Sequence, residues 1–131
     1  MKIILLMATF LCSLMAMDEE LNIYNAFKKA QDANRPIYYI VTSASCEHCY
    51  KHLKDTVIPN SDLIRKDFVL AMSDLSKGDK VPSDLPFDGK TPTTYIIAPN
   101  GTLMVSPLVG NFDKIYLYEI LDKVYKAYAI K

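Results

Sequence analysis

Apolar and polar positions alternate in blocks along this chain, and the spacing within each block predicts its secondary structure. Residues 18–34 carry apolar side chains at helical spacing, which predicts a helix that ends before Pro36. The apolar positions of this helix are Ile23, Ala26, Phe27 and Ala30. Residues 37–41 are apolar without alternation, which is typical of a strand covered on both faces of a sheet. We therefore expect this strand in the centre of the sheet.

A second strand follows after a helical segment. Residues 50–58 are compatible with a helix that Pro59 should stop, and residues 61–66 suggest a turn or a short helix. Residues 68–72 then read as a strand. A strand, a helix and a strand in that order predict a right-handed parallel crossover. Residues 73–90 are rich in Asp, Ser, Gly and Pro, and we expect a loop there that forms a rim beside the cysteines discussed below.

The last third of the chain predicts a hairpin and a closing helix. Residues 91–98 form an apolar strand, Asn100-Gly101 is a strong turn signal, and residues 102–105 should pair back as an antiparallel fourth strand. One apolar stripe then runs along a helix that should cover the sheet. Its members are Leu117, Ile120, Leu121, Val124 and Tyr128. The pattern as a whole predicts an α/β fold.

Length and charge narrow the class of protein. The chain has 131 residues, enough for a single packed domain, and half of them are hydrophobic while 23% are charged, a globular composition. The formal charge is zero; without residues 1–16, which contain one Lys and no acid, it is −1. This balance argues against nucleic acid as a partner.

The first sixteen residues have the layout of a secretory signal peptide. Lys2 precedes an apolar run that is short for a membrane span, and an acidic stretch begins at Asp18. We expect a signal peptide at 1–16, one domain at 17–131 and a periplasmic or otherwise exported protein. Leu14 occupies a position where a small residue is usual before cleavage, so an uncleaved anchor is the alternative. Cys12 would leave with the signal.

Cys46 and Cys49 form the candidate catalytic pair. They stand three positions apart where a strand gives way to a helix, so they can close into a disulfide or remain a thiol pair. The free N–H groups of a helix start favour a thiolate, which predicts that Cys46 is the attacking sulfur. Cys49 shares a helix face with Leu53 and Val57, which predicts that it is buried and resolves the mixed disulfide.

Two charged neighbours should tune this pair. An imidazolium on His48 would stabilise the Cys46 thiolate and make the pair a better oxidant. A carboxylate on Glu47 opposes thiolate formation. The two effects predict a reduction potential between the strongly reducing and the strongly oxidising ends of the range.

Other interpretations of these residues stay open. A structural disulfide this short would add little stability, because the loop that it closes is minimal. A zinc or copper(I) site would use Cys46, His48, Cys49 and His52, but no second ligand cluster appears elsewhere in the sequence, and we expect no metal. His52 is expected on the surface of its helix. Four tyrosines are expected in the core, or else around the cysteines as an apolar rim: Tyr38, Tyr39, Tyr50 and Tyr95.

A Cys-X-X-Cys pair at the start of the crossover helix, with Thr91-Pro92-Thr93 leading into a later strand, resembles the thioredoxin superfamily. The likeness covers nearly all of the chain after the signal. The N-terminal helix, Asn34-Arg35-Pro36 and the run from Asp62 to Leu70 look most similar to exported thioredoxin-like proteins related to the C-terminal domain of the electron carrier DsbD.

The resemblance implies a thioredoxin fold, with a central mixed four-stranded sheet in the order 2-1-3-4 flanked by helices. It also implies a cis peptide before Pro92, so that Thr91 and Pro92 lie against the sulfurs and bind substrate. The chain departs from the family in two places. Ser45 stands where Trp is common, and Ile40 stands where thioredoxins carry a buried acid that assists proton transfer. His52 and Glu47 are the candidates to replace that acid.

These observations predict an exported thiol:disulfide oxidoreductase that exchanges electrons with protein substrates through Cys46 and Cys49. Its only cofactor would be its own redox-active disulfide, and a separate redox partner, expected in the membrane, would recharge it. The alternative is a non-catalytic thioredoxin-like module that binds a client or a metal.

Overall fold

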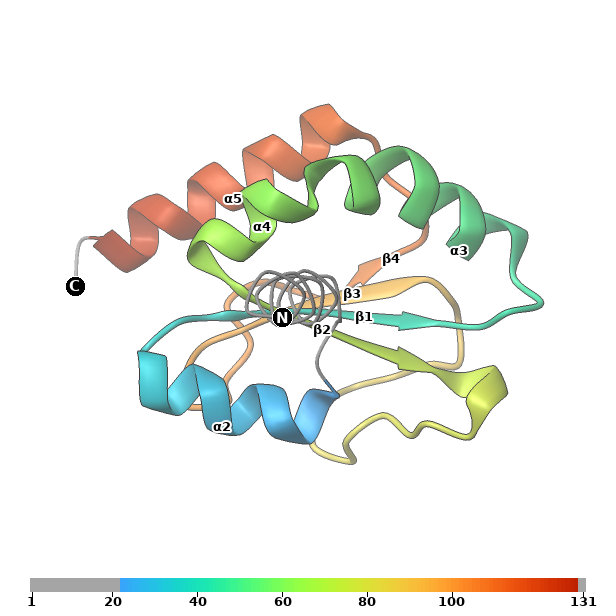
Figure 1. Cartoon of the computed structure of the whole chain (residues 1–131), viewed down its shortest axis with the longest axis horizontal. Helices are drawn as coiled ribbons and strands as arrows, with labels where there is room; N and C mark the ends of the chain where they lie inside the picture. The colour runs from blue at the N-terminus through green and yellow to red at the C-terminus, as the bar shows by residue number, and fades with distance from the viewer. Residues whose placement is uncertain (1–21, 130–131) are drawn as a thin grey trace, which may run out of the picture.

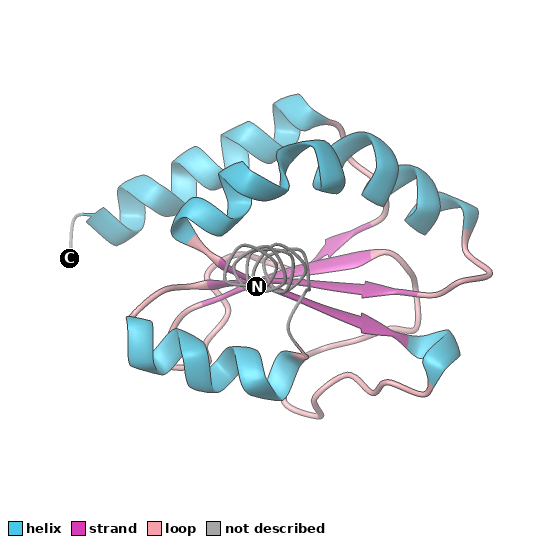
Figure 2. Ribbon diagram, viewed as in Figure 1, coloured by secondary structure: helices cyan, strands magenta, loops and turns pink. Residues whose placement is uncertain are grey.

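A computed structural model of the chain describes residues 22–129, with side chains to residue 127. Four helices and a four-stranded sheet form three layers (Figures 1 and 2). The α-helices are α2 (Ile23–Ala33), α3 (Glu47–His52), α4 (Ser61–Asp67) and α5 (Lys114–Ala129). The strands are β1 (Ile37–Thr42), β2 (Val69–Asp74), β3 (Thr93–Ile97) and β4 (Leu108–Val109). The predicted signal peptide, with Cys12, lies outside the described residues.

The sheet has the order β2-β1-β3-β4, which confirms the order predicted from the resemblance. β1 pairs in parallel with β2, where Ile37 faces Val69, and antiparallel with β3, where Ile37 faces Ile97. All six residues of β1 are buried, as the unbroken apolar run predicted. The β1-helix-β2 crossover places the start of α3 beyond the end of the central strand.

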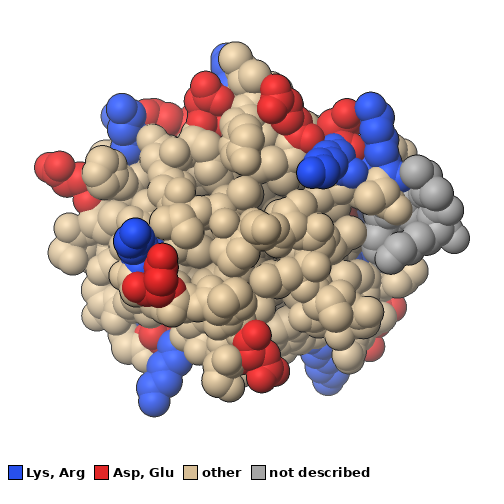
Figure 3. Space-filling view, turned by 180° about the vertical axis from the view of Figure 1, so that it is seen from behind, with Lys and Arg blue, Asp and Glu red and all other residues tan. Residues whose placement is uncertain are grey.

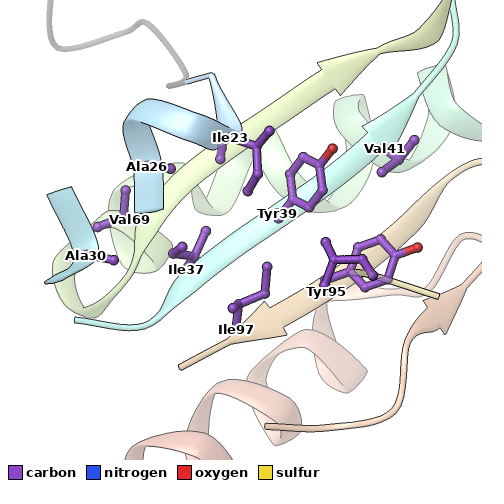
Figure 4. Close-up of a cluster of buried hydrophobic side chains, with 11 residues drawn as sticks. Ile23, Ala26, Ala30, Ile37, Tyr39, Val41, Val69, Tyr95 and Ile97 are labelled. Atoms are coloured by element: carbon purple, nitrogen blue, oxygen red, sulfur yellow. The ribbon is translucent and has the colours of Figure 1, made fainter. Parts of the chain in front are cut away.

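The two faces of the sheet carry separate cores. On one face, α2 and residues of the 75–87 segment pack against the odd-numbered side chains of β1, as Figure 4 shows for Tyr39 and its neighbours. On the other face, α4, α5 and the segment between α3 and α4 pack against Tyr38 and Ile40. Figure 1 shows this division: α2 lies on one side of the sheet, and α3, α4 and α5 lie on the other.

The helices at both ends of the described chain confirm their predictions. α2 begins after Asn22, whose side chain accepts hydrogen bonds from the N–H groups of Tyr24 and Asn25, and ends at Asn34 in a left-handed conformation. In α5 the predicted stripe is buried at Leu117, Ile120, Leu121 and Val124, while the side chain of Tyr128 lies outside the described part. No helix within residues 22–129 has the length and apolar character needed to cross a bilayer.

The helical segment after the cysteines is longer than predicted. Pro59 does not stop it: α3 continues into a π-helical turn (η1, Leu53–Val57), a 3-10 turn (η2, Ile58–Asn60) and α4 without a break. Pro59 is tolerated because it stands in the first turn of η2, where its missing N–H is not needed. The prediction of a stop at Pro59 is therefore wrong.

The fourth strand also differs from its prediction. The Asn100-Gly101 turn forms, but residues 102–105 make only one isolated bridge, between Leu103 and Ile97. The strand that pairs antiparallel with β3 is Leu108–Val109 instead. Met104 and Val105 both pack into the core under α5, and two adjacent side chains on one side are incompatible with the alternation of a strand.

The 73–90 segment is more ordered than the predicted loop. β2 extends to Asp74, and a 3-10 turn follows (η3, Leu75–Lys77). Further along, Leu85 is buried against the α2 side of the sheet, and the Tyr95 hydroxyl donates to the Pro86 carbonyl at 2.7 Å. Residues 79–90 form a loop, as predicted, but Leu75, Val81, Leu85 and Phe87 pack against the α2 face of the sheet. The turn at Leu75–Lys77 reaches the loop before the cysteines through Ser76.

Candidate redox site

Cys46 lies immediately beyond β1, at the start of α3. The backbone leaves β1 at Thr42, turns through residues 43–45 and enters the helix with Cys46 as its N-cap. The sulfur of Cys46 accepts a hydrogen bond from the N–H group of Cys49 at 3.1 Å, in the role that a Ser or Asp oxygen usually has at a cap. A negative charge on this sulfur would therefore be stabilised by a helix N–H that has no partner within the helix.

The two sulfurs differ in exposure. Cys46 is half-buried, whereas Cys49 is 2% exposed, which confirms that Cys49 is the inner member of the pair. Their Cα atoms are 5.2 Å apart and the side chains form a disulfide. Of these two cysteines, only Cys46 offers a sulfur to a visiting molecule.

Thr91 and Pro92 lie across from Cys46. The peptide bond between them is cis, and the Thr91 carbonyl oxygen is 3.4 Å from the Cys46 sulfur. The Pro92 carbonyl accepts from the N–H group of Gly110 at 2.8 Å, and the Thr93 hydroxyl donates to the Lys90 carbonyl at 2.7 Å. Pro92 is buried and Thr91 is partly exposed, so the Thr91 backbone borders the accessible sulfur.

Glu47 and His48 are exposed between the two cysteines. Tyr50, on the same helix, is 69% exposed, with the Lys54 ammonium 5.9 Å from its ring centre. The other three tyrosines of the predicted set, Tyr38, Tyr39 and Tyr95, are fully buried. The expectation of a core role is therefore correct for those three and wrong for Tyr50.

The prediction that His52 lies on the surface of its helix is wrong. Its side chain is fully buried, its Nδ1 lies 2.9 Å from the Asn111 Oδ1, and its ring packs edge-on against Phe112 at 4.6 Å between centres. Burial lowers the pKa of His52 from its ordinary value, while the hydrogen bond with Asn111 partly offsets that effect. His52 is therefore a buried group with a neutral ring at neutral pH.

Two further contacts near the site were missed by the sequence prediction. The N–H group of Ala44, two residues before Cys46, donates to the Ser76 hydroxyl at 3.2 Å. Ser76 is held in turn by the Asp74 carboxylate, which accepts from its N–H group at 3.0 Å and from its hydroxyl. Asp-X-Ser at a strand end is a known turn signal, but its contact with Ala44 depends on the fold.

The structure does not bring the four candidate metal ligands together. Cys46 and Cys49 are bonded to each other, His48 is exposed, and His52 is buried with its Nδ1 against Asn111. Within the described residues, no three His, Cys, Asp or Glu side chains gather in a group suited to a metal ion.

Solved structures share this architecture at low sequence identity. A thioredoxin from Thermus thermophilus is 20% identical with a TM-score of 0.64, over 81% of this chain and 85% of that one. The oxidised C-terminal domain of DsbD from Neisseria meningitidis is 15% identical with a TM-score of 0.59, over 80% and 98%. An oxidoreductase named DsbH is 12% identical with a TM-score of 0.59, over 86% and 85%. Neither a family model nor a curated protein sequence matches the chain. The likeness shows a thioredoxin-like fold.

Proposed function

On a thioredoxin-like fold with a cysteine pair at the start of α3, we propose that this chain is an exported thiol:disulfide oxidoreductase that acts on proteins. The observation that carries the proposal is the asymmetry of the pair. The Cys46 sulfur is accessible and accepts a helix N–H, whereas Cys49 is buried directly behind it. This arrangement suits one attacking and one resolving thiol.

The reaction has two exchange steps. The Cys46 thiolate attacks one sulfur of a substrate disulfide; that disulfide breaks, and one substrate thiolate leaves. The Cys49 thiolate then attacks the Cys46 sulfur, so that the Cys46–Cys49 bond forms and the second substrate thiolate leaves. Two electrons pass from the pair to the substrate, and the reverse sequence oxidises a dithiol.

Thr91 and Pro92 are the proposed substrate-binding residues. The Thr91 backbone borders Cys46, so an extended polypeptide could bind beside it much as an added strand does. Residues 91–112 contain no Lys, Arg, Asp or Glu. On the face seen from behind in Figure 3, charges of both signs are mixed and the middle is largely uncharged. The uncharged stretch that begins at Thr91 suits polypeptides of varied charge better than nucleic acid.

Insulin reduction with a thiol donor tests this function. Wild type should accelerate the reaction, while Cys46→Ser should be indistinguishable from buffer because it lacks the attacking sulfur. Cys49→Ala should instead accumulate mixed disulfides, which would identify protein substrates. Equal, negligible rates for wild type and Cys46→Ser would favour the alternative, a module that binds a client without redox chemistry.

Glu47 and His48 are proposed to set the reduction potential. Removing the imidazole with His48→Ala should shift the potential toward more reducing values, and Glu47→Ala should shift it toward more oxidising values. Equilibration against glutathione measures both shifts and also distinguishes an oxidant from a reductant. Lys51→Ala is the control, because Lys51 is exposed on the same helix but lies outside the Cys-X-X-Cys motif. Its reduction potential shows how much any nearby charge contributes. If the reduction potential of His48→Ala equals that of wild type, His48 does not help to set the potential.

The proposed location and partner follow from the sequence. An exported chain with one redox pair needs a second protein to renew its electrons, and we propose a membrane redox protein for that role. Fractionation of cells that produce the full chain tests the location, and recovery in the cytosol would contradict it.

A further inference from the structure

The buried ring of His52 is not yet used by the redox cycle. It is fully buried, although an imidazole is an ionisable group whose burial costs free energy. Buried ionisable groups with a shifted pKa are concentrated at functional sites. The position of His52, one helical turn after Cys49, suggests where such a function would act.

The hydrogen bond with Asn111 defines which nitrogen of His52 is free. The Asn111 Oδ1 can only accept, so Nδ1 carries the proton in this arrangement. Nε2 then holds a lone pair, and it has no hydrogen-bond partner among the described residues. Because burial lowers the pKa of His52, this lone pair is available at neutral pH. His52 therefore presents a buried base on the inner side of the helix that carries Cys49.

Two other buried polar atoms share this side of the sheet, and neither can act as a base. The Tyr38 hydroxyl and the Thr94 hydroxyl also lack a hydrogen-bond partner of ordinary geometry within the described part of the chain. Burial raises the pKa of Tyr38 strongly, with Thr94 offsetting only part of the effect, so Tyr38 stays protonated. The remaining inward residue of β1 here is Ile40, which is apolar. Glu47 is exposed.

We propose that neutral His52 accepts, at Nε2, the proton that Cys49 must lose before it resolves the mixed disulfide on Cys46. In the disulfide form Nε2 makes no hydrogen bond with the Cys49 sulfur, so the proton passes through one water. The Cys49 thiolate then attacks the Cys46 sulfur, the bond between Cys46 and the substrate sulfur breaks, and its electron pair leaves with the substrate thiolate. His52 returns its proton to that thiolate or to solvent. The inference rests on the proposed redox function.

A purely structural role for His52 is the competing explanation. His52 joins α3 to the segment after β4 through Asn111, and this segment also contacts Pro92 through Gly110. Thr56 makes a similar connection one turn later, because its buried hydroxyl donates to the Phe112 carbonyl at 2.7 Å. Thr56 has no basic group, so Thr56→Val is a matched control that weakens the connection and leaves the base in place.

The test follows both thiols of the full chain with 5,5′-dithiobis(2-nitrobenzoate). A Cys12→Ser background leaves Cys46 and Cys49 as the only thiols. In stopped flow, the first release of thionitrobenzoate reports attack by Cys46, and the second reports resolution by Cys49. We expect His52→Gln to slow the second release roughly 100-fold at pH 7, the low end of general-base effects, and to leave the first within about twofold. His52→Leu should behave alike if the Gln variant does not fold.

The pH profile separates a base from a structural group. In wild type, the rate of the second release should fall below about pH 6.5 as His52 becomes protonated. His52→Gln should lack this fall in rate at acidic pH. At high pH, where the Cys49 thiol ionises without a base, the rate of the variant should approach that of wild type. The groups that contact the ring or share its helix face are Cys49, Thr56, Asn111 and Phe112, with Tyr116 behind Phe112. None of these groups is a carboxylate, a lysine or a second histidine.

The outcomes are distinct. Thr56→Val should retain the wild-type second phase; if it slows that phase as much as His52→Gln does, the structural explanation replaces the proposal. A second phase unchanged in both His52 variants overturns the role of His52 and leaves the redox function intact. Absence of the first release in wild type would instead overturn the redox function itself.

Discussion

The two faces of the sheet treat their buried polar groups differently, although neighbouring residues of one strand supply both. On the α2 face, the Tyr39 hydroxyl lies 2.6 Å from the Ser73 hydroxyl, and the Tyr95 hydroxyl donates to the Pro86 carbonyl. On the opposite face, the Tyr38 hydroxyl, the Thr94 hydroxyl and the His52 Nε2 have no hydrogen-bond partner of ordinary geometry among the described residues. Tyr38 and Tyr39 are adjacent in β1 and equally buried.

The difference distinguishes the α2 face, whose buried polar groups are hydrogen-bonded, from the face that carries the redox site. Each unpaired buried polar group costs about 1–3 kcal/mol, so a face with three of them is less stable than an apolar one would be. This face lies under the helix with the cysteines, whereas the fully hydrogen-bonded face is remote from Cys49. We infer that polar groups on the α2 face contribute more to stability than those on the face under the cysteine helix.

The largest expected effect comes from opening the α2 face. Leu85 is 7% exposed and anchors the 75–90 segment in that core. Leu85→Ala should lower the free energy of unfolding by about 2–4 kcal/mol through lost burial and a cavity. Urea unfolding measures this loss. The neighbouring exposed Asp84→Ala should stay within about 0.5 kcal/mol, and a similar loss in both variants would mean that Leu85 is no anchor.

A matched pair of hydroxyl deletions sharpens the comparison. Tyr39→Phe leaves the buried Ser73 hydroxyl unpaired and should cost about 1–3 kcal/mol of unfolding free energy. Tyr38→Phe removes a hydroxyl that has no hydrogen-bond partner of ordinary geometry among the described residues, and it should be neutral or stabilising. Thermal and urea unfolding of the two variants give the contrast, and equal losses would show that the faces do not differ.

The smallest effect is a pH dependence of stability. The pKa of His52 is lowered in the folded state, so between that value and about 6.5 the unfolded chain binds more protons than the folded one. Stability should therefore fall as the pH drops through 6.5, with a slope of at most about 1.4 kcal/mol per pH unit. His52→Gln should flatten this slope. Asp74, whose pKa is lowered mainly by the Ser76 hydroxyl, acts only below about 3.8.

The elements that depend on local pattern could be predicted from the sequence. The unbroken apolar run of β1 identified the central strand, and helical spacing located α2 and α5. The helix-start position of Cys46 and the burial of Cys49 followed from the same spacing. The fourth strand could not be located, because the turn signal at Asn100-Gly101 fixes where the chain reverses and not where pairing resumes.

His52 was misplaced because one helix face was assigned from apolar residues alone. Cys49, His52 and Thr56 are all buried at helical spacing, so two polar residues shared the inner stripe with the cysteine. A buried polar residue beside a reactive one was the available signal. The partners Asn111 and Ser76 come from distant segments, and only the completed fold brings them to the site.

The π-helical turn at Leu53–Val57 has a consequence for how related chains should be compared with this one. A turn closed by i→i+5 hydrogen bonds contains one residue more than an α-helical turn. Removing one exposed residue there, Lys54 or Asp55, would close this turn as an α-helical one ahead of the 3-10 turn at Ile58–Asn60. Alignments of this segment should therefore allow a single-residue gap between the redox motif and Pro59.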